Sequence, residues 1–154
     1  MENREAAKAV FAIASLLESL DANPYRVRAY RRAALRLMRL PESAREHTNQ
    51  KGELDLPWLG PRLRRKLGEL VVDGHMRFYD ELLETLPRSM RDLLGVPGVG
   101  PKTAARLMHD AGITSVAELA GAAHAGKLRQ LRMIGPVRES QLGQAAEALL
   151  GRAA

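Results

Sequence analysis

Apolar side chains recur at intervals of three or four residues along most of the chain, which is the spacing of one face of an α-helix. The clearest stripe lies in residues 2–20 and comprises Val10, Ile13, Ala14, Leu17 and Leu20. No segment sustains the strict alternation of apolar and polar residues that is typical of a strand, and aromatic residues are few. We therefore predict an all-α fold.

Capping residues and prolines set the expected helix boundaries. Asn23 and Pro24 supply an N-cap and a first-turn proline for a second helix. Ser115 and Glu118 form a capping box for a later one. The helix capped by Ser115 is expected to continue to about Ala125. Further helices are expected from Pro41 to about Thr48, over residues 61–73 up to Gly74, along the apolar stripe of residues 79–86, and at the C-terminal end around Leu142 and Leu149.

The most informative stretch is residues 93–107, which reads Leu-Leu-Gly-Val-Pro-Gly-Val-Gly-Pro-Lys-Thr-Ala-Ala-Arg-Leu. A helix end leads into a glycine turn, and Pro101 then stands where a second helix begins. Gly98 and Gly100 lack a Cβ, so this turn can be tight and a phosphate can approach its backbone. The first amides of the second helix form an anion site, which predicts phosphate contacts at Gly98, Gly100, Lys102 and Thr103. The alternative is a glycine-rich connection with no ligand.

This hairpin pattern recurs at intervals of roughly forty residues, which is hard to obtain by chance. A copy at residues 54–63 has Trp58 in the place of the first glycine, and a degenerate copy at residues 131–137 has Met133 there. Trp58 has two interpretations. It is a packing residue, or it stacks on an exposed base or abasic sugar at a break in DNA.

The segment Pro87-Arg88-Ser89 is the best candidate for a domain boundary. We predict a helical domain over residues 1–87, with the first hairpin unit at 54–73. A second domain over residues 88–154 is expected to hold the central hairpin unit at 93–111 and the degenerate one at 128–149.

The chain carries a formal charge of +6, which favours a polyanionic partner. Six arginines fill much of the exposed circumference of the second predicted helix, with almost no acid among them: Arg26, Arg28, Arg31, Arg32, Arg36 and Arg39. We interpret them as a phosphate-facing surface, although such a run can also be an ordinary solvated helix face. Arg62, Arg65 and Lys66 form a second basic group in the helix after the first hairpin.

Composition excludes several classes of site. The chain has no cysteine, so disulfides and thiolate metal sites are absent. Its four histidines, His47, His75, His109 and His124, lack the spacing of metal ligands, so we expect surface or structural roles for them. No apolar run reaches the length of a membrane span, and the N-terminus lacks a signal-peptide core. We expect a cytoplasmic protein without membrane contact, associated with the nucleoid through DNA.

The order of the motifs resembles a known family. Asn-Pro-Tyr-Arg-Val-Arg-Ala-Tyr-Arg-Arg-Ala-Ala (residues 23–34), Leu-Pro-Trp-Leu-Gly-Pro-Arg-Leu-Arg-Arg-Lys-Leu (residues 56–67) and the central hairpin are similar to the N-terminal half of bacterial family X DNA polymerases, relatives of DNA polymerase beta. The similarity covers about residues 5–150 and implies a lyase-like helical domain followed by a tandem helix-hairpin-helix domain. The palm domain of that family is missing from these 154 residues, so we expect no polymerase activity from this chain alone.

The resemblance implies a site and an activity. In the family, the first domain binds the 5′-phosphate in a DNA gap and removes a deoxyribose phosphate through a lysine imine. The corresponding lysine is Lys66, with Arg26 and Arg62 at phosphate-binding positions and Tyr30 at a tyrosine of the motif. The family also binds a monovalent cation through backbone carbonyls, here those of Leu94, Val96 and Val99. Trp58 departs from the usual glycine at the first hairpin. No other cofactor is expected, beyond this Na⁺ or K⁺.

The chemistry of Lys66 fits this role. An amine nucleophile must be partly unprotonated near neutral pH, and nearby arginines together with burial lower the pKa of a lysine. The chain uses 19 Arg against 5 Lys, so a lysine at this position is notable. Three functions stay open: a non-catalytic module that binds gapped, nicked or abasic DNA, the same module with lyase activity, or a regulatory protein that contacts a separate repair enzyme.

Overall fold

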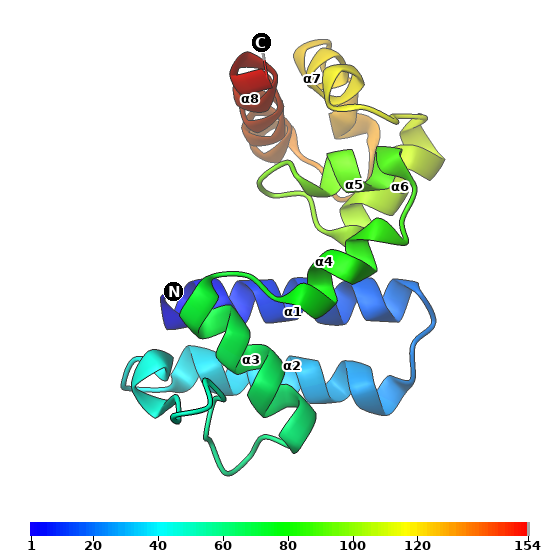
Figure 1. The fold of residues 1–154 in the computed structure, drawn as a ribbon. Helices are drawn as coiled ribbons and strands as arrows, with labels where there is room; N and C mark the ends of the chain where they lie inside the picture. The colour runs from blue at the N-terminus through cyan, green and yellow to red at the C-terminus, as the bar shows by residue number, and fades with distance from the viewer. Residues whose placement is uncertain (154) are drawn as a thin grey trace. The chain divides into compact units, whose positions relative to one another are not determined.

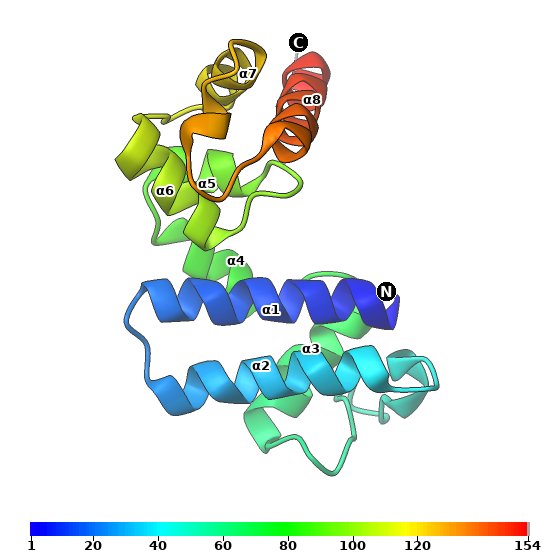
Figure 2. The same cartoon turned by 180° about the vertical axis from the view of Figure 1, so that it is seen from behind.

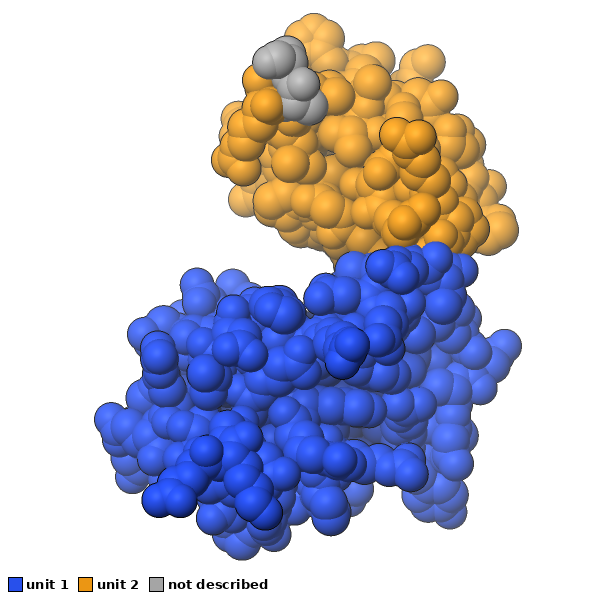
Figure 3. Space-filling view, viewed as in Figure 1, with its two compact units in different colours: residues 1–85 blue, residues 86–154 orange. Residues whose placement is uncertain are grey.

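The computed structural model describes residues 1–153 and divides the chain into two compact units. Unit 1 comprises residues 1–85 and unit 2 residues 86–154, which Figure 3 shows in different colours. Each unit has a hydrophobic core of its own. Within residues 1–153 the secondary structure is eight α-helices and two short 3-10 helices, and the β pairing is one isolated bridge between Thr48 and Leu54. The prediction of an all-α fold is confirmed.

Unit 1 is built on a helical pair. α1 (Asn3–Ser19) and α2 (Pro24–Arg39) lie side by side, and α3 packs across them (Figures 1 and 2). The side chain of Asn23 accepts a hydrogen bond from the Tyr25 amide at 2.9 Å, so the predicted N-cap of α2 is present. The remaining elements are the 3-10 helix η1 (Ala44–His47), α3 (Pro61–Asp73) and α4 (Arg77–Glu84).

The short helix predicted from Pro41 to about Thr48 is present only as the 3-10 helix η1, so its predicted start at Pro41 is wrong. Asn3 on α1 explains the difference. Its side-chain amide donates to the Glu42 carbonyl at 2.7 Å, and its carbonyl oxygen accepts from the Ala44 amide at 2.7 Å. These bonds satisfy the backbone in an extended conformation and compete with helix formation.

A close backbone approach at Gly68 fixes the loop before the first hairpin. A Cβ on Gly68 would lie 2.1 Å from the Gly52 carbonyl oxygen and 2.8 Å from the Cα of Glu53. Only glycine permits this contact between α3 and the loop. The loop in turn carries Leu54, whose amide donates to the Arg64 carbonyl of α3 at 2.8 Å.

Unit 2 contains the two remaining hairpins. Its elements are α5 (Arg88–Leu94), α6 (Pro101–Ala111), α7 (Val116–His124), the 3-10 helix η2 (Leu128–Gln130) and α8 (Pro136–Ala153). Ser115 caps α7 by accepting from the Glu118 amide, as the capping box predicts, while the Glu118 carboxylate accepts from Thr114. The units divide between Thr85 and Leu86, against a predicted boundary after Pro87.

An ion pair with a buried carboxylate joins η2 to the start of α8. The Glu139 carboxylate is 2% exposed and accepts hydrogen bonds from the Arg129 amide and from two nitrogens of its guanidinium. The hydrogen bonds from the Arg129 side chain hold the pKa of Glu139 below its usual value. This pair fixes the entry of the third hairpin into α8.

Candidate nucleic-acid interface

The three predicted hairpins share one pattern of backbone hydrogen bonds. In each, a tight turn is closed by a hydrogen bond between residues three apart, and a glycine–proline pair then starts the following helix. The turn amides of Leu59, Val99 and Ile134 donate to the carbonyls of Leu56, Val96 and Leu131, and the helices begin at Gly60–Pro61, Gly100–Pro101 and Gly135–Pro136. The repeat that the sequence indicates is therefore a repeat of structure.

The central hairpin presents its backbone to solvent. Gly98 is exposed and has a φ of +92°, so this turn requires glycine. Gly100 has a φ of −92°, which any residue adopts, but a Cβ there would meet no atom within 4 Å. The backbone at Gly100 is thus open to a ligand, and the nearby Lys102 is exposed. Of the predicted cation ligands, Val96 already accepts a hydrogen bond from the Val99 amide at 3.0 Å, which leaves one lone pair on its carbonyl oxygen.

Thr103 does not offer its side chain to this surface. The residue is 7% exposed, and its hydroxyl accepts a hydrogen bond from the Arg138 guanidinium at 3.0 Å. The phosphate contact predicted at Thr103 therefore rests on its backbone amide, because Arg138 of α8 already occupies the hydroxyl. Arg138, which sequence reasoning missed, occupies the position in the third hairpin that Thr103 has in the central one.

The first hairpin differs at its tip. Trp58 has no positive φ, is half-buried and packs against the core of unit 1. The Arg36 guanidinium lies 5.4 Å from the centroid of its ring. Arg64 braces the turn by donating to the Leu59 carbonyl at 3.0 Å and to the Asp55 carboxylate at 3.1 Å.

Three helices of unit 1 bring the candidate nucleophile into an aromatic cluster. The Lys66 amine lies 3.5 Å from the Tyr30 hydroxyl, a long hydrogen bond, and 3.9 Å from the centroid of the Phe78 ring. The rings of Tyr30 and Phe78 stack with centroids 6.3 Å apart, and the Arg26 guanidinium lies 4.7 Å from the Phe78 centroid. We call Arg26, Tyr30, Lys66 and Phe78 the Lys66 cluster.

The surroundings of Lys66 change its protonation. Burial is the main cause that lowers the pKa of the Lys66 ammonium. The positive charges of Arg26, Arg62 and Arg65 lower this pKa further. The face of the Phe78 ring attracts the charged form and acts in the opposite direction. For Tyr30, which is 2% exposed, burial raises the pKa of the phenol, so it stays protonated at neutral pH.

Phe78 is the member of the Lys66 cluster that sequence reasoning missed. The apolar stripe that the sequence predicts here begins at Tyr79 and does not include Phe78. The chain has only two phenylalanines, and one of them stands directly after a helix-initiating Met76–Arg77 step. No spacing within α4 predicts that its ring meets a lysine of α3, since this contact depends on the packing of three helices.

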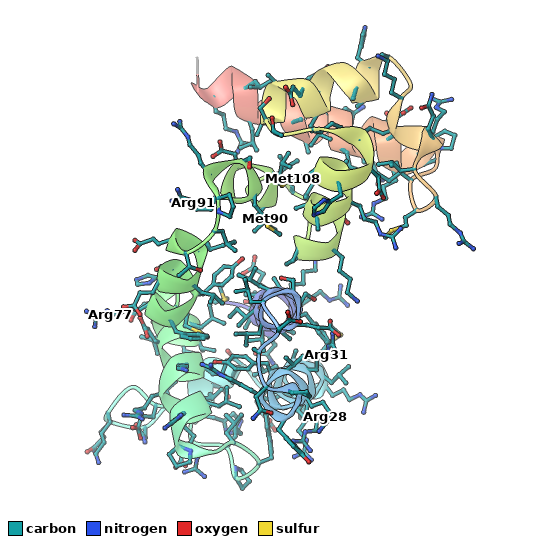
Figure 4. The ribbon with its side chains drawn as sticks, turned by 90° about the vertical axis from the view of Figure 1, so that its right-hand side faces the viewer. Arg28, Arg31, Arg77, Met90, Arg91 and Met108 are labelled. Carbon is teal, nitrogen blue, oxygen red and sulfur yellow. The ribbon has the colours of Figure 1, made fainter. Side chains whose placement is uncertain are left out.

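The arginines of α2 differ in their surroundings. Arg31 pairs with Glu18 of α1, so its charge is already partly compensated within unit 1, and the phosphate contact at Arg31 stays a prediction. Because Glu18 lies on a different helix, counting the acidic residues along α2 does not reveal this ion pair. Arg28, Arg32 and Arg36 are exposed at intervals of four residues, and the Arg28 guanidinium lies 4.6 Å from the centroid of the Tyr25 ring (Figure 4 labels Arg28 and Arg31).

Other classes of site find no support in the described part of the chain. Residues 1–153 contain no cluster of three histidine or acidic side chains that could hold a metal ion. No helix among them is both long and apolar enough to cross a membrane.

Comparison with known proteins agrees with this geometry. Residues 1–76 match the family model described as a helix-hairpin-helix domain, and residues 90–147 match the model of a SAM-like helix-hairpin-helix tandem. The chain is built from helix-hairpin-helix domains. Such domains indicate DNA as the binding partner.

A curated relative extends the comparison over both units. The chain is 26% identical over 145 residues to the DNA polymerase/3′-5′ exonuclease PolX of Bacillus subtilis (strain 168). The match covers 94% of this chain and 25% of that protein, so the chain spans about a quarter of the length of its relative. This is the relationship to family X DNA polymerases that the motifs predict.

Proposed function

We propose that this helix-hairpin-helix protein binds gapped, nicked or abasic DNA without sequence preference, acts in DNA repair, and uses Lys66 as a deoxyribose-phosphate lyase. The observation that carries the proposal is the Lys66 cluster, whose amine has a pKa lowered by burial, by Arg26 and by the nearby Arg62 and Arg65. An unprotonated amine beside phosphate-binding groups is what imine chemistry on a sugar phosphate requires.

In this proposal two features bind DNA, namely the arginines beside Lys66 and the backbone amides of the central hairpin. Arg26 and Arg62 flank Lys66 and suit a terminal 5′-phosphate, because a guanidinium binds phosphate oxygens in pairs. The amides of Lys102 and Thr103 at the start of α6, which follow the uncrowded Gly100, suit an internal phosphodiester. Both contacts reach the backbone of DNA and not its bases, which gives affinity without sequence preference.

The chemical step uses the chain's own amine. The Lys66 nitrogen adds to the C1′ aldehyde of a ring-opened abasic sugar, and loss of water leaves an iminium. This acidifies the C2′ proton. Once that proton is removed, the bond between C3′ and its oxygen breaks, and the 3′-phosphate leaves with the electron pair. Hydrolysis of the imine frees Lys66 and an unsaturated sugar phosphate.

Tyr30 has a different role from the one its hydroxyl first suggests. A phenol with a raised pKa does not take a proton at neutral pH. We propose that Tyr30 is a positioning residue that holds the Lys66 amine through the 3.5 Å hydrogen bond. A water molecule then removes the C2′ proton.

The preference for gaps is tested by anisotropy on paired substrates. On a gapped duplex, we expect a 5′-phosphate to bind about tenfold more tightly than a 5′-hydroxyl, since charge-assisted bonds are involved. Arg62→Ala should remove most of this preference, whereas Arg45→Ala, at an exposed position on η1, should keep it. Affinity should also fall steeply with salt. Equal binding of the two gapped duplexes by the wild type would contradict the proposal.

A monovalent cation completes the central hairpin in this proposal. The carbonyls of Leu94, Val96 and Val99 would hold Na⁺ or K⁺, whose charge attracts a phosphate. Replacing both ions with tetramethylammonium at constant ionic strength should weaken DNA binding several-fold. Unchanged affinity in that buffer would remove the cation from the proposal.

The third hairpin favours the alternative function. Val137, which corresponds to Lys102, is 73% exposed, and Met133 is also exposed. Val137 lines a mostly apolar groove of about 640 Å³, together with Pro97, Gly98, Pro136 and Leu142. A separate repair enzyme would suit this surface, and a protein with that role alone would not bind DNA at physiological salt.

A further inference from the structure

A small basic pocket lies beside the first hairpin of unit 1. It has a volume of about 290 Å³, and we call it the Trp58 pocket. Its walls come from one side of α2 and from the turn that leads into α3. The lining residues are Ala29, Arg32, Ala33, Arg36, Trp58, Leu59, Gly60 and Leu63.

The lining combines an aromatic wall with uncompensated positive charge. Trp58, Leu59 and Leu63 form the apolar part, and the alanines of α2 leave room between the walls. Arg32 and Arg36 supply the charge, and none of the lining residues is acidic. Among the ion pairs found in the described residues, none involves either arginine. A ligand that fits this lining is planar and apolar at one end and anionic at the other.

The pocket adjoins the Lys66 cluster along two helices. Leu63 precedes Lys66 by three residues on α3, and Ala29 stands next to Tyr30 on α2. A separation of three residues along a helix is about 4.5 Å. When the 5′-phosphate of a gapped duplex lies at Lys66, the unpaired nucleotides of the opposite strand begin beside that phosphate, and the pocket is the neighbouring site for them.

We propose that the Trp58 pocket binds one unpaired nucleotide, whose base replaces the Arg36 guanidinium on the Trp58 ring and whose phosphate lies between Arg32 and Arg36. The inference rests on the proposed DNA-binding function and extends it to the recognition of single-stranded segments. The volume lies at the lower end of ligand pockets and admits a single nucleotide but no base pair. Because every base has a π-face, the pocket reads the absence of pairing and not the sequence.

The test uses the fluorescence of Trp58, which is the single tryptophan of the chain. The full chain is titrated with a 5′-phosphorylated duplex whose gap holds unpaired nucleotides and with a nicked duplex that is fully paired. We expect the gapped duplex to quench the emission by about half or more, and the nicked duplex to leave it nearly unchanged. The Trp58→Leu variant should bind the gapped duplex about 5- to 150-fold more weakly than the wild type does.

Two variants protect this test against misfolding. Trp58→Phe keeps an aromatic wall and should bind the gapped duplex within about threefold of the wild type. Arg36→Ala, at an exposed position, should lose about tenfold, whereas Arg4→Ala on α1 should lose nothing. The fluorescence measurement is made on the wild type, so its result does not depend on whether any variant folds.

The outcomes separate this inference from the proposed function. If the wild type binds no DNA by anisotropy, the proposed function fails and the inference fails with it. If the wild type binds the gapped duplex, yet its emission is unchanged and Trp58→Leu binds equally well, Trp58 is a packing residue only. The inference is then overturned, while DNA binding stands.

Discussion

Lys66→Arg should abolish covalent trapping of the protein on DNA. When the wild type is mixed with a 5′-deoxyribose-phosphate substrate and borohydride, reduction of the iminium should leave a stable adduct. Arginine keeps the positive charge of Lys66, but it stays protonated and does not form this imine. We expect the adduct to fall at least about 100-fold, to the background of the assay. Anisotropy should show that Lys66→Arg still binds the substrate.

Lys51→Arg is the matched control for this experiment. Lys51 is exposed in the loop before the first hairpin, outside the Lys66 cluster, so its replacement should leave the adduct unchanged. Lys66→Ala should behave like Lys66→Arg in trapping. An equal adduct with either Lys66 variant, or no adduct with the wild type, would end the lyase proposal.

The pH profile of trapping gives a second readout. Burial and the neighbouring arginines lower the pKa of Lys66, so more of its amine is unprotonated at a given pH than in an ordinary lysine. The trapping rate should therefore rise with pH and reach half its maximum below the usual lysine value of about 10.4. A midpoint at or above that value would show that the cluster does not activate the amine.

The sequence predicted backbone features better than side-chain contacts. The hairpins could be found because each depends on a short run of residues: the apolar positions of the turn, a Gly–Pro pair and the helix that follows. Gly98 is the clearest case, since its positive φ is a local requirement of the turn. Such features are determined by neighbours in the chain, so one sequence suffices to see them.

The contacts that were missed all join separate elements. Glu18 neutralises Arg31 across α1 and α2, and Asn3 prevents a helix after Pro41. The Phe78 ring reaches Lys66 only because α4 packs beside α3. A count of charges along one helix treats every arginine alike. Tertiary packing decides which arginines pair with acidic residues of other helices and which are available to a ligand. The sequence predicted a lowered pKa for Lys66 from the arginines near it in α3, and the packing added the charge of Arg26 from α2 and the burial that contributes most.

Substitution at Gly100 should separate DNA binding from stability. Gly100 is the N-cap of α6, where serine is favoured because its hydroxyl accepts hydrogen bonds from the first amides of the helix. A Cβ at this position meets no atom within 4 Å, so Gly100→Ser fits without a clash. The hydroxyl would then occupy the amides that a phosphate needs. We expect the melting temperature to stay the same or rise, and DNA affinity to fall about tenfold or more.

Gly135→Ser provides the comparison within the same unit. Gly135 precedes Pro136 at the start of α8, and a Cβ there also meets no atom within 4 Å. Since exposed Met133 and Val137 replace Gly98 and Lys102 in this hairpin, its amides should contribute little to phosphate binding, and the loss of affinity should stay below about twofold. Gly98→Ala is less useful, because its φ of +92° adds strain to any change in binding. If Gly100→Ser raises stability and leaves DNA affinity intact, the central hairpin does not bind phosphate through its amides, and the arginines of unit 1 must carry the interaction.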